Sequence, residues 1–180
     1  MTIDPFDLLR QLEACPAGIA GWRQFEDVCV DILRYLFVPP LGEPMIEQRS
    51  FSGIDRRDAI FPNRNMDTMS IWGQLRHELN ARLVLFEFKN YDAEEIGKDE
   101  VDQTRNYLTR PMGRLAIVCC NKEPSFSALL RRNQVYTQDE KVILFLMPKH
   151  LREMIFMRER GDDPARLLMD LLELFYVQHE

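Results

Sequence analysis

Residues 82–89, with the sequence RLVLFEFK, decide the fold of this chain. An apolar run this short, bounded by charges, predicts a buried strand that is covered on both faces. Because side chains alternate between the two faces of a strand, Glu87 and Lys89 share one face with Leu83 and Leu85. Two charged groups therefore lie where the apolar pattern predicts core. Such burial is costly unless each charge is paired or binds a metal, so the end of this strand is a candidate functional site.

The segments around this strand predict an α/β fold, in which helices flank a mixed central β-sheet. The Ser52-Gly53 turn makes the first two strands an antiparallel hairpin, whereas helices separate the last three strands and allow parallel pairing. Strands are expected over residues 45–51, 57–61, 82–89, 115–120 and 142–147, and helices over residues 5–15, 21–37, 67–80, 98–109, 125–136, 148–161 and after 163–164.

The length of 180 residues predicts a single domain over 1–180, with its core at about 20–147 and a helical C-terminal extension at 148–180. The content of 46% hydrophobic and 29% charged residues is typical of a soluble globular protein. No apolar run approaches the roughly 18 residues of a membrane span, and the first residues carry acids where a signal peptide carries bases. We therefore expect a cytoplasmic protein with no membrane partner.

The cysteines and histidines do not predict a zinc site. The four cysteines lack paired CxxC spacing, and the adjacent Cys119 and Cys120 would point to opposite faces of a strand. Reduced, buried thiols are therefore expected. The three histidines are scattered along the chain, and His77 lacks the second histidine that a metalloprotease helix needs four residues later.

The net charge of −6 argues against a protein that coats nucleic acid through its overall charge. Arginines nevertheless gather in two parts of the sequence. One group is Arg49, Arg56, Arg57 and Arg64, and the other is Arg105, Arg110 and Arg114. The pattern leaves open whether these groups bind phosphate or are solvated charges that balance nearby acids.

The candidate catalytic residues are Asp58, Glu87 and Lys89. A mixed sheet can bring the two carboxylates together, and Mg²⁺ prefers such oxygen ligands. The ion would polarise a phosphoryl oxygen, while Lys89 would orient or deprotonate the attacking water and offset charge in the transition state. Asp55 is an alternative ligand, but its side chain has the opposite parity, so at most one of the two aspartates can join Glu87.

Glu26 is a further candidate on the helix over residues 21–37. It shares an apolar stripe with Trp22, Val30 and Leu33. Its carboxylate either complements the positive N-terminal end of the helix or faces inward with a functional role. The pattern alone leaves both possibilities open.

The order of these residues resembles the PD-(D/E)xK nuclease superfamily, which has the restriction-endonuclease-like fold. Asp58 is similar to the family's aspartate on the second strand of a hairpin, and Glu87-Phe88-Lys89 to the Glu-x-Lys that ends the third strand. Residues 103–107, QTRNY, resemble the QxxxY motif of some branches of the family. The resemblance covers residues 20–147 in element order.

The resemblance implies a magnesium-dependent endonuclease, with Mn²⁺ as a possible substitute for Mg²⁺. Asp58, Glu87 and the backbone carbonyl of Phe88 would bind the metal. Lys89 would activate water, and Glu26 would tune the site or bind a second ion.

Substrate contacts are expected from Gln103 and Tyr107, whose spacing of four places them on one helix face, and from Arg57. Arg57 also replaces the proline that gives the family its name. The expected substrate is DNA, in antiviral defence or repair, with a homo-oligomer or protein partner that supplies part of the DNA grip. The alternatives are an inactive nuclease-like module for binding or assembly, and a ribonuclease or junction resolvase on the same fold.

Overall fold

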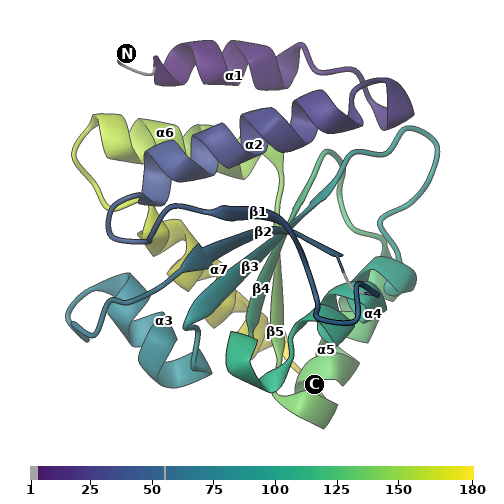
Figure 1. The fold of residues 1–180 in the computed structure, drawn as a ribbon, viewed down its shortest axis with the longest axis vertical. Coiled ribbons are helices and arrows are strands. Elements are labelled where there is room, and N and C mark those ends of the chain that lie inside the picture. Colours follow the sequence, from purple (N-terminus) through teal and green to yellow (C-terminus); the bar gives the residue numbers. More distant parts are fainter. Residues whose placement is uncertain (1–3, 55) are drawn as a thin grey trace.

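The computed structural model describes residues 4–54 and 56–180, and its described part contains a five-stranded sheet in the order β1-β2-β3-β4-β5 (Figure 1). β1, β2 and β3 pair in antiparallel fashion, whereas β3, β4 and β5 pair in parallel. The predicted α/β fold with a mixed sheet is confirmed. The strands are β1 (Met45–Arg49), β2 (Arg56–Pro62), β3 (Leu83–Lys89), β4 (Leu115–Cys120) and β5 (Val142–Leu146).

Helices cover both faces of the sheet (Figure 1). The main core lies between one face and α1, α2, α3, α6 and α7, and two smaller apolar clusters lie between the other face and α4, α5 and η2. The helices are α1 (Pro5–Glu13), α2 (Trp22–Phe37), α3 (Ile71–Leu79), α4 (Lys98–Tyr107), α5 (Phe126–Asp139), α6 (Pro148–Glu159) and α7 (Ala165–Gln178), with 3-10 helices η1 (Gly18–Ala20) and η2 (Arg110–Met112).

The alternation predicted for β3 is confirmed. Val84, Phe86 and Phe88 point into the main core, whereas Leu83 and Leu85 pack in a cluster on the α4 side. Both faces of β3 are therefore covered, which explains its nearly continuous apolar sequence. The neighbouring strand behaves in the same way, because Cys119 and Cys120 belong to cores on opposite faces, and both thiols are free.

The C-terminal helices belong to the main core. Leu168, Leu172 and Phe175 of α7 are at most 2% exposed and pack in the same cluster as α2 and β3. α6 adds buried side chains to that cluster as well. Of the helices in the described ranges, none is long and apolar enough to cross a bilayer.

α3 begins later than the sequence predicts, at Ile71 rather than near residue 67. The side chains of Asn65 and Asp67 accept hydrogen bonds from the backbone two residues ahead, and this pattern competes with helix formation. Ser70 then caps the helix by accepting a hydrogen bond from the Gly73 N–H at 3.1 Å. The helix can therefore start only after Ser70.

Candidate active site

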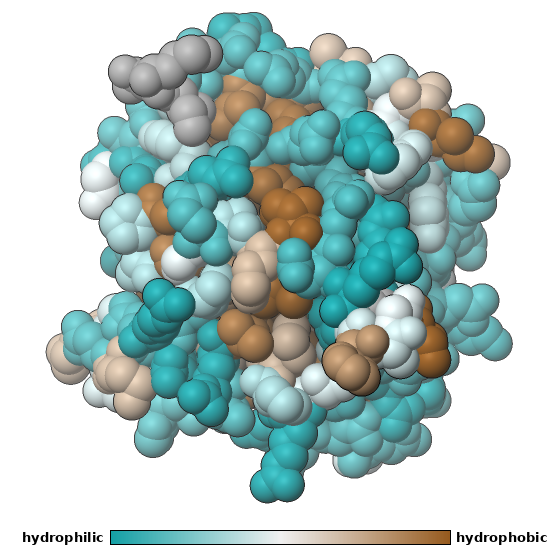
Figure 2. Space-filling view, viewed as in Figure 1, coloured by the Kyte–Doolittle hydropathy of each residue, from teal (hydrophilic) through white to brown (hydrophobic). Residues whose placement is uncertain are grey.

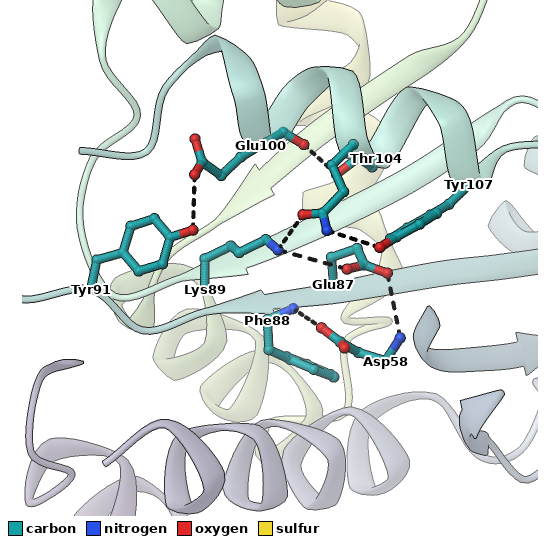
Figure 3. A network of polar contacts seen from close by, with 9 residues as sticks. Asp58, Glu87, Phe88, Lys89, Tyr91, Glu100, Thr104 and Tyr107 are labelled. Atoms are coloured by element: carbon teal, nitrogen blue, oxygen red, sulfur yellow. Dashed lines mark hydrogen bonds and ion pairs between the residues drawn. The ribbon is translucent and has the colours of Figure 1, made fainter. Parts of the chain in front are cut away.

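β2 and β3 separate at the point where the candidate carboxylates lie (Figure 3). Their regular pairing runs as far as Ala59 and Phe86. Beyond it, the Phe88 N–H donates to Asp58 Oδ2 at 3.0 Å, and the Asp58 N–H donates to Glu87 Oε1 at 3.4 Å. Side chains thus replace the backbone partners of a normal ladder. Because the N–H and C=O of a strand residue point to the same side, the Phe88 carbonyl also faces the β2 edge, beside Asp58.

A chain of hydrogen bonds continues from β3 to α4. Lys89 Nζ lies 3.9 Å from Glu87 Oε2 and donates to Gln103 Oε1 at 2.8 Å. Gln103 Nε2 in turn donates to the Tyr107 hydroxyl at 2.8 Å. The helix face predicted for Gln103 and Tyr107 is therefore the face that meets β3. The structure thus brings Asp58, Glu87, Lys89, Gln103 and Tyr107 into one connected network.

Tyr91 and Glu100 fix the start of α4 next to this network, and sequence reasoning did not identify them (Figure 3). The Tyr91 hydroxyl donates to Glu100 Oε1 at 2.8 Å, and Glu100 Oε2 accepts from the Gly97 N–H at 2.7 Å. Burial, followed by the hydrogen bond to Glu100, raises the pKa of Tyr91, which keeps the hydroxyl a donor. The sequence did contain a signal for Glu100: a glutamate three residues after the N-cap residue of a helix is typical of a capping box, and Glu100 lies three residues after Gly97.

Glu87 lies in an environment that disfavours a negative charge on its carboxyl group. Its side chain is almost completely buried, with 1% exposure. Burial, and then the negative charge of Asp58, raise the pKa of Glu87 to about 8, while Lys89 opposes this rise. A cation next to both carboxylates would relieve the repulsion between them.

The donor set of Asp58, Glu87 and the Phe88 carbonyl suits a hard divalent cation. Mg²⁺ is bound in proteins through one or two carboxylates, with waters and substrate phosphate completing its shell. Residues 4–54 and 56–180 hold no group of three or more His, Cys, Asp or Glu side chains arranged to bind a metal. The two carboxylates and the carbonyl oxygen fit Mg²⁺ or Mn²⁺ better than zinc, for which histidine and cysteine are common ligands. The alternative ligand Asp55 lies outside the described residues.

Glu26 lies on α2 and is 7% exposed. Burial, and then the charges of Asp58 and Glu47, raise the pKa of Glu26 to about 7. The carboxylate therefore faces inward, within the field of the candidate site. Among the described residues it forms no hydrogen bond with Asp58 or Glu87, so its link to the site is electrostatic.

Arg57 is buried and directed at the end of α4. Its Nε donates to the Tyr107 carbonyl at 3.1 Å, and its guanidinium carbon lies 5.9 Å from the centre of the Tyr107 ring. Arg57 therefore ties β2 to the helix that carries Gln103. A contact with substrate stays a prediction.

No family model matches the chain, and no solved structure gives a significant match. Among curated proteins, the chain is similar to the "Putative transposon gamma-delta 80.3 kDa protein" of Escherichia coli (strain K12), with 28% identity over 175 residues. The alignment covers 93% of this chain and 24% of that protein, so the chain spans about a quarter of the relative's length.

Proposed function

We propose that this chain is a metal-dependent nuclease that hydrolyses phosphodiester bonds, with DNA as its substrate. The observation that carries the proposal is the network at the open end of β2 and β3. There, Asp58 and Glu87 lie side by side, and Lys89 is held between Glu87 and Gln103. The resemblance of these residues to the PD-(D/E)xK pattern supports the same function.

Each residue has a defined role in this proposal. Asp58, Glu87 and the Phe88 carbonyl would hold Mg²⁺ or Mn²⁺, and the bound ion supplies Lewis-acid polarisation of a phosphoryl oxygen. Lys89 orients the attacking water and offsets the negative charge that grows on the phosphate. Gln103 is a positioning residue, because it accepts a hydrogen bond from Lys89 and so fixes the ammonium group.

The choice of DNA rests on the resemblance and on the printed name of the E. coli relative, which describes a transposon protein. A transposon is a DNA element, so DNA as the substrate suits both. The role in defence or repair rests on the resemblance alone. The chain has a net charge of −6, which disfavours binding to the phosphate backbone of DNA. A second copy of the chain or a protein partner would therefore supply part of the DNA-binding surface.

The test is a substrate panel of plasmid, linear duplex, single-stranded DNA and RNA, incubated with the protein in Mg²⁺, Mn²⁺ or EDTA. Wild type is compared with Lys89→Ala and with Lys98→Ala, which removes an exposed lysine from the start of α4. We expect cleavage of DNA in Mg²⁺ or Mn²⁺, none in EDTA, and a loss of about 10²- to 10⁴-fold in Lys89→Ala only.

Other outcomes of the panel are equally informative. Cleavage of RNA alone would replace the DNA assignment with a ribonuclease, and selective cleavage of branched DNA would indicate a junction resolvase. If the wild type cuts nothing, or Lys89→Ala cuts as well as Lys98→Ala, the catalytic assignment is wrong. The chain would then be better described as a nuclease-like module for binding or assembly.

A further inference from the structure

Arg64, Arg76 and Arg82 surround two adjoining hollows at the start of β3, the end opposite to the candidate active site. The hollows have volumes of about 360 and 490 Å³ and share Arg76 and Arg82 in their linings. Of the described residues that line either hollow, none is acidic. In a chain with a net charge of −6, this surface is a local concentration of positive charge. Hydrophilic residues cover most of the surface over α3 in Figure 2.

Two of these guanidinium groups are available for a ligand. Arg64 and Arg82 are exposed, and within the described residues their side chains form no hydrogen bond or ion pair. Arg76 is half-buried and donates to the carbonyl of Asn63, which holds it at the shared wall of the two hollows. An exposed arginine that merely balances an acid would show that acid as its partner, and these two do not.

One buried asparagine fixes the segments that carry the arginines. Asn63 is 0% exposed, and its Nδ2 donates to the carbonyls of Trp72 at 2.9 Å and Ala81 at 3.0 Å. Its own N–H donates to the Arg82 carbonyl at 2.8 Å. The loop after β2, the helix α3 and the turn before β3 are therefore held together by one residue. This arrangement fixes the backbone positions of the arginines relative to one another before any ligand binds.

The positive surface continues onto η2. Gly113 has φ +89° and packs so closely on the turn before β3 that a Cβ there would lie 2.0 Å from the Asn80 carbonyl oxygen. A third hollow of about 560 Å³ lies at this junction and includes Arg110 and Lys141. Its one described acid, Asp139, is already paired with Arg105 and Lys141.

We propose that Arg64, Arg76, Arg82 and Arg110 form a second nucleic-acid contact that binds the phosphodiester backbone. Guanidinium groups match the geometry of phosphate oxygens, and a row of three hollows suits a polymer better than a single phosphate. The seven residues of β3 span about 20 Å, or roughly six nucleotide steps of a duplex strand, so one nucleic acid can reach both ends.

Binding is measured without cleavage, so that the result does not depend on the proposed nuclease function. Each protein carries Glu87→Gln, and its affinity for a fluorescein-labelled duplex of about 30 base pairs is measured by anisotropy in EDTA at several salt concentrations. R64A/R82A removes the two available guanidinium groups. The matched control, R152A/R160A, removes two exposed arginines from α6 and its C-terminal end and changes the net charge equally.

We expect R64A/R82A to weaken binding about tenfold near 100 mM salt and to reduce the slope of log affinity against log salt by about 2, since each lost phosphate contact removes about 0.9. The control should bind within about twofold of the parent. Equal loss in both double variants, or no loss in R64A/R82A, would overturn the proposal. Displacement of the duplex by inorganic phosphate beyond the effect of chloride at equal ionic strength would show a site for single phosphates and overturn the polymer assignment.

Discussion

At the scale of the residue, the burial of Glu87 determines the protonation state of a candidate metal ligand. Its carboxyl group is 1% exposed and lies next to Asp58, and both features raise its pKa to about 8. Without a cation, the folded protein therefore keeps this proton at neutral pH. A bound divalent cation would instead favour the ionised carboxylate that a metal site needs.

The raised pKa of Glu87 predicts a pH-dependent stability. Between the ordinary pKa of 4.5 and about 8, the folded protein binds more protons than the unfolded chain, so the free energy of unfolding falls as pH rises through this window. Glu26 acts with the same sign between 4.5 and about 7. Urea unfolding in EDTA at pH 5, 6, 7 and 8 should show this decline in wild type and a shallower one in Glu87→Gln. Equal slopes would mean that Glu87 ionises normally in the folded protein.

Gln103 should affect turnover rather than substrate affinity. Gln103→Ala removes the acceptor that holds Lys89 Nζ, so we expect kcat to fall about tenfold with little change in KM. Tyr107→Phe removes the outer hydrogen bond, which Gln103 donates, and should have a smaller effect on kcat. Asp99→Asn, an exposed change on the same helix, is the control. A rise in KM with unchanged kcat would instead place Gln103 in direct contact with substrate.

At the scale of the element, the site depends on where β2 and β3 stop pairing. The Asp58 carboxylate accepts the Phe88 N–H that a regular ladder would bond to backbone. Asp58 is therefore both a structural acceptor and a candidate metal ligand. The two roles can be separated by choosing substitutions that keep or remove the acceptor.

Asp58→Ala should lower the free energy of unfolding by about 1 to 3 kcal/mol, because it leaves the Phe88 N–H without its charged acceptor. Asp58→Asn keeps an acceptor oxygen and should cost less than about 1 kcal/mol. Both variants should lose metal-dependent cleavage. Chemical denaturation and the cleavage assay together check this prediction, which fails if the two variants are equally unstable or if Asp58→Asn remains active.

The sequence predicted the parts of the fold that follow local patterns. Alternation along β3 placed Glu87 and Lys89 on one face, and a spacing of four placed Gln103 with Tyr107. The late start of α3 was missed, because the side chains of Asn65, Asp67 and Ser70 compete for backbone hydrogen bonds there. The hydrogen-bond partners of Arg57 and Asn63 could not be predicted. Arg57 donates to the carbonyl of Tyr107, which is distant in the sequence, and Asn63 donates to the carbonyl of Ala81, whose position depends on the geometry of the turn before β3.

At the scale of the whole molecule, the C-terminal helices complete the core against which the site is built. Leu172 of α7 is fully buried in the cluster that also contains Phe86 of β3. Leu172→Ala should lower the free energy of unfolding by about 2 to 5 kcal/mol, as expected for a buried leucine. Val177→Ala, an exposed change on the same helix, should have little effect. Similar stabilities in urea denaturation would show that α7 packs only loosely on the sheet.

The central claim is that the paired carboxylates of β2 and β3 support metal-dependent phosphodiester hydrolysis. The most direct measurement is the rate of DNA cleavage in Mg²⁺ by wild type, Glu87→Gln and the exposed control Glu95→Gln, each shown to be folded. We predict a rate about 10²- to 10³-fold lower in Glu87→Gln and an unchanged rate in Glu95→Gln. Cleavage by Glu87→Gln at the wild-type rate would contradict the claim, as would the absence of cleavage by a folded wild type.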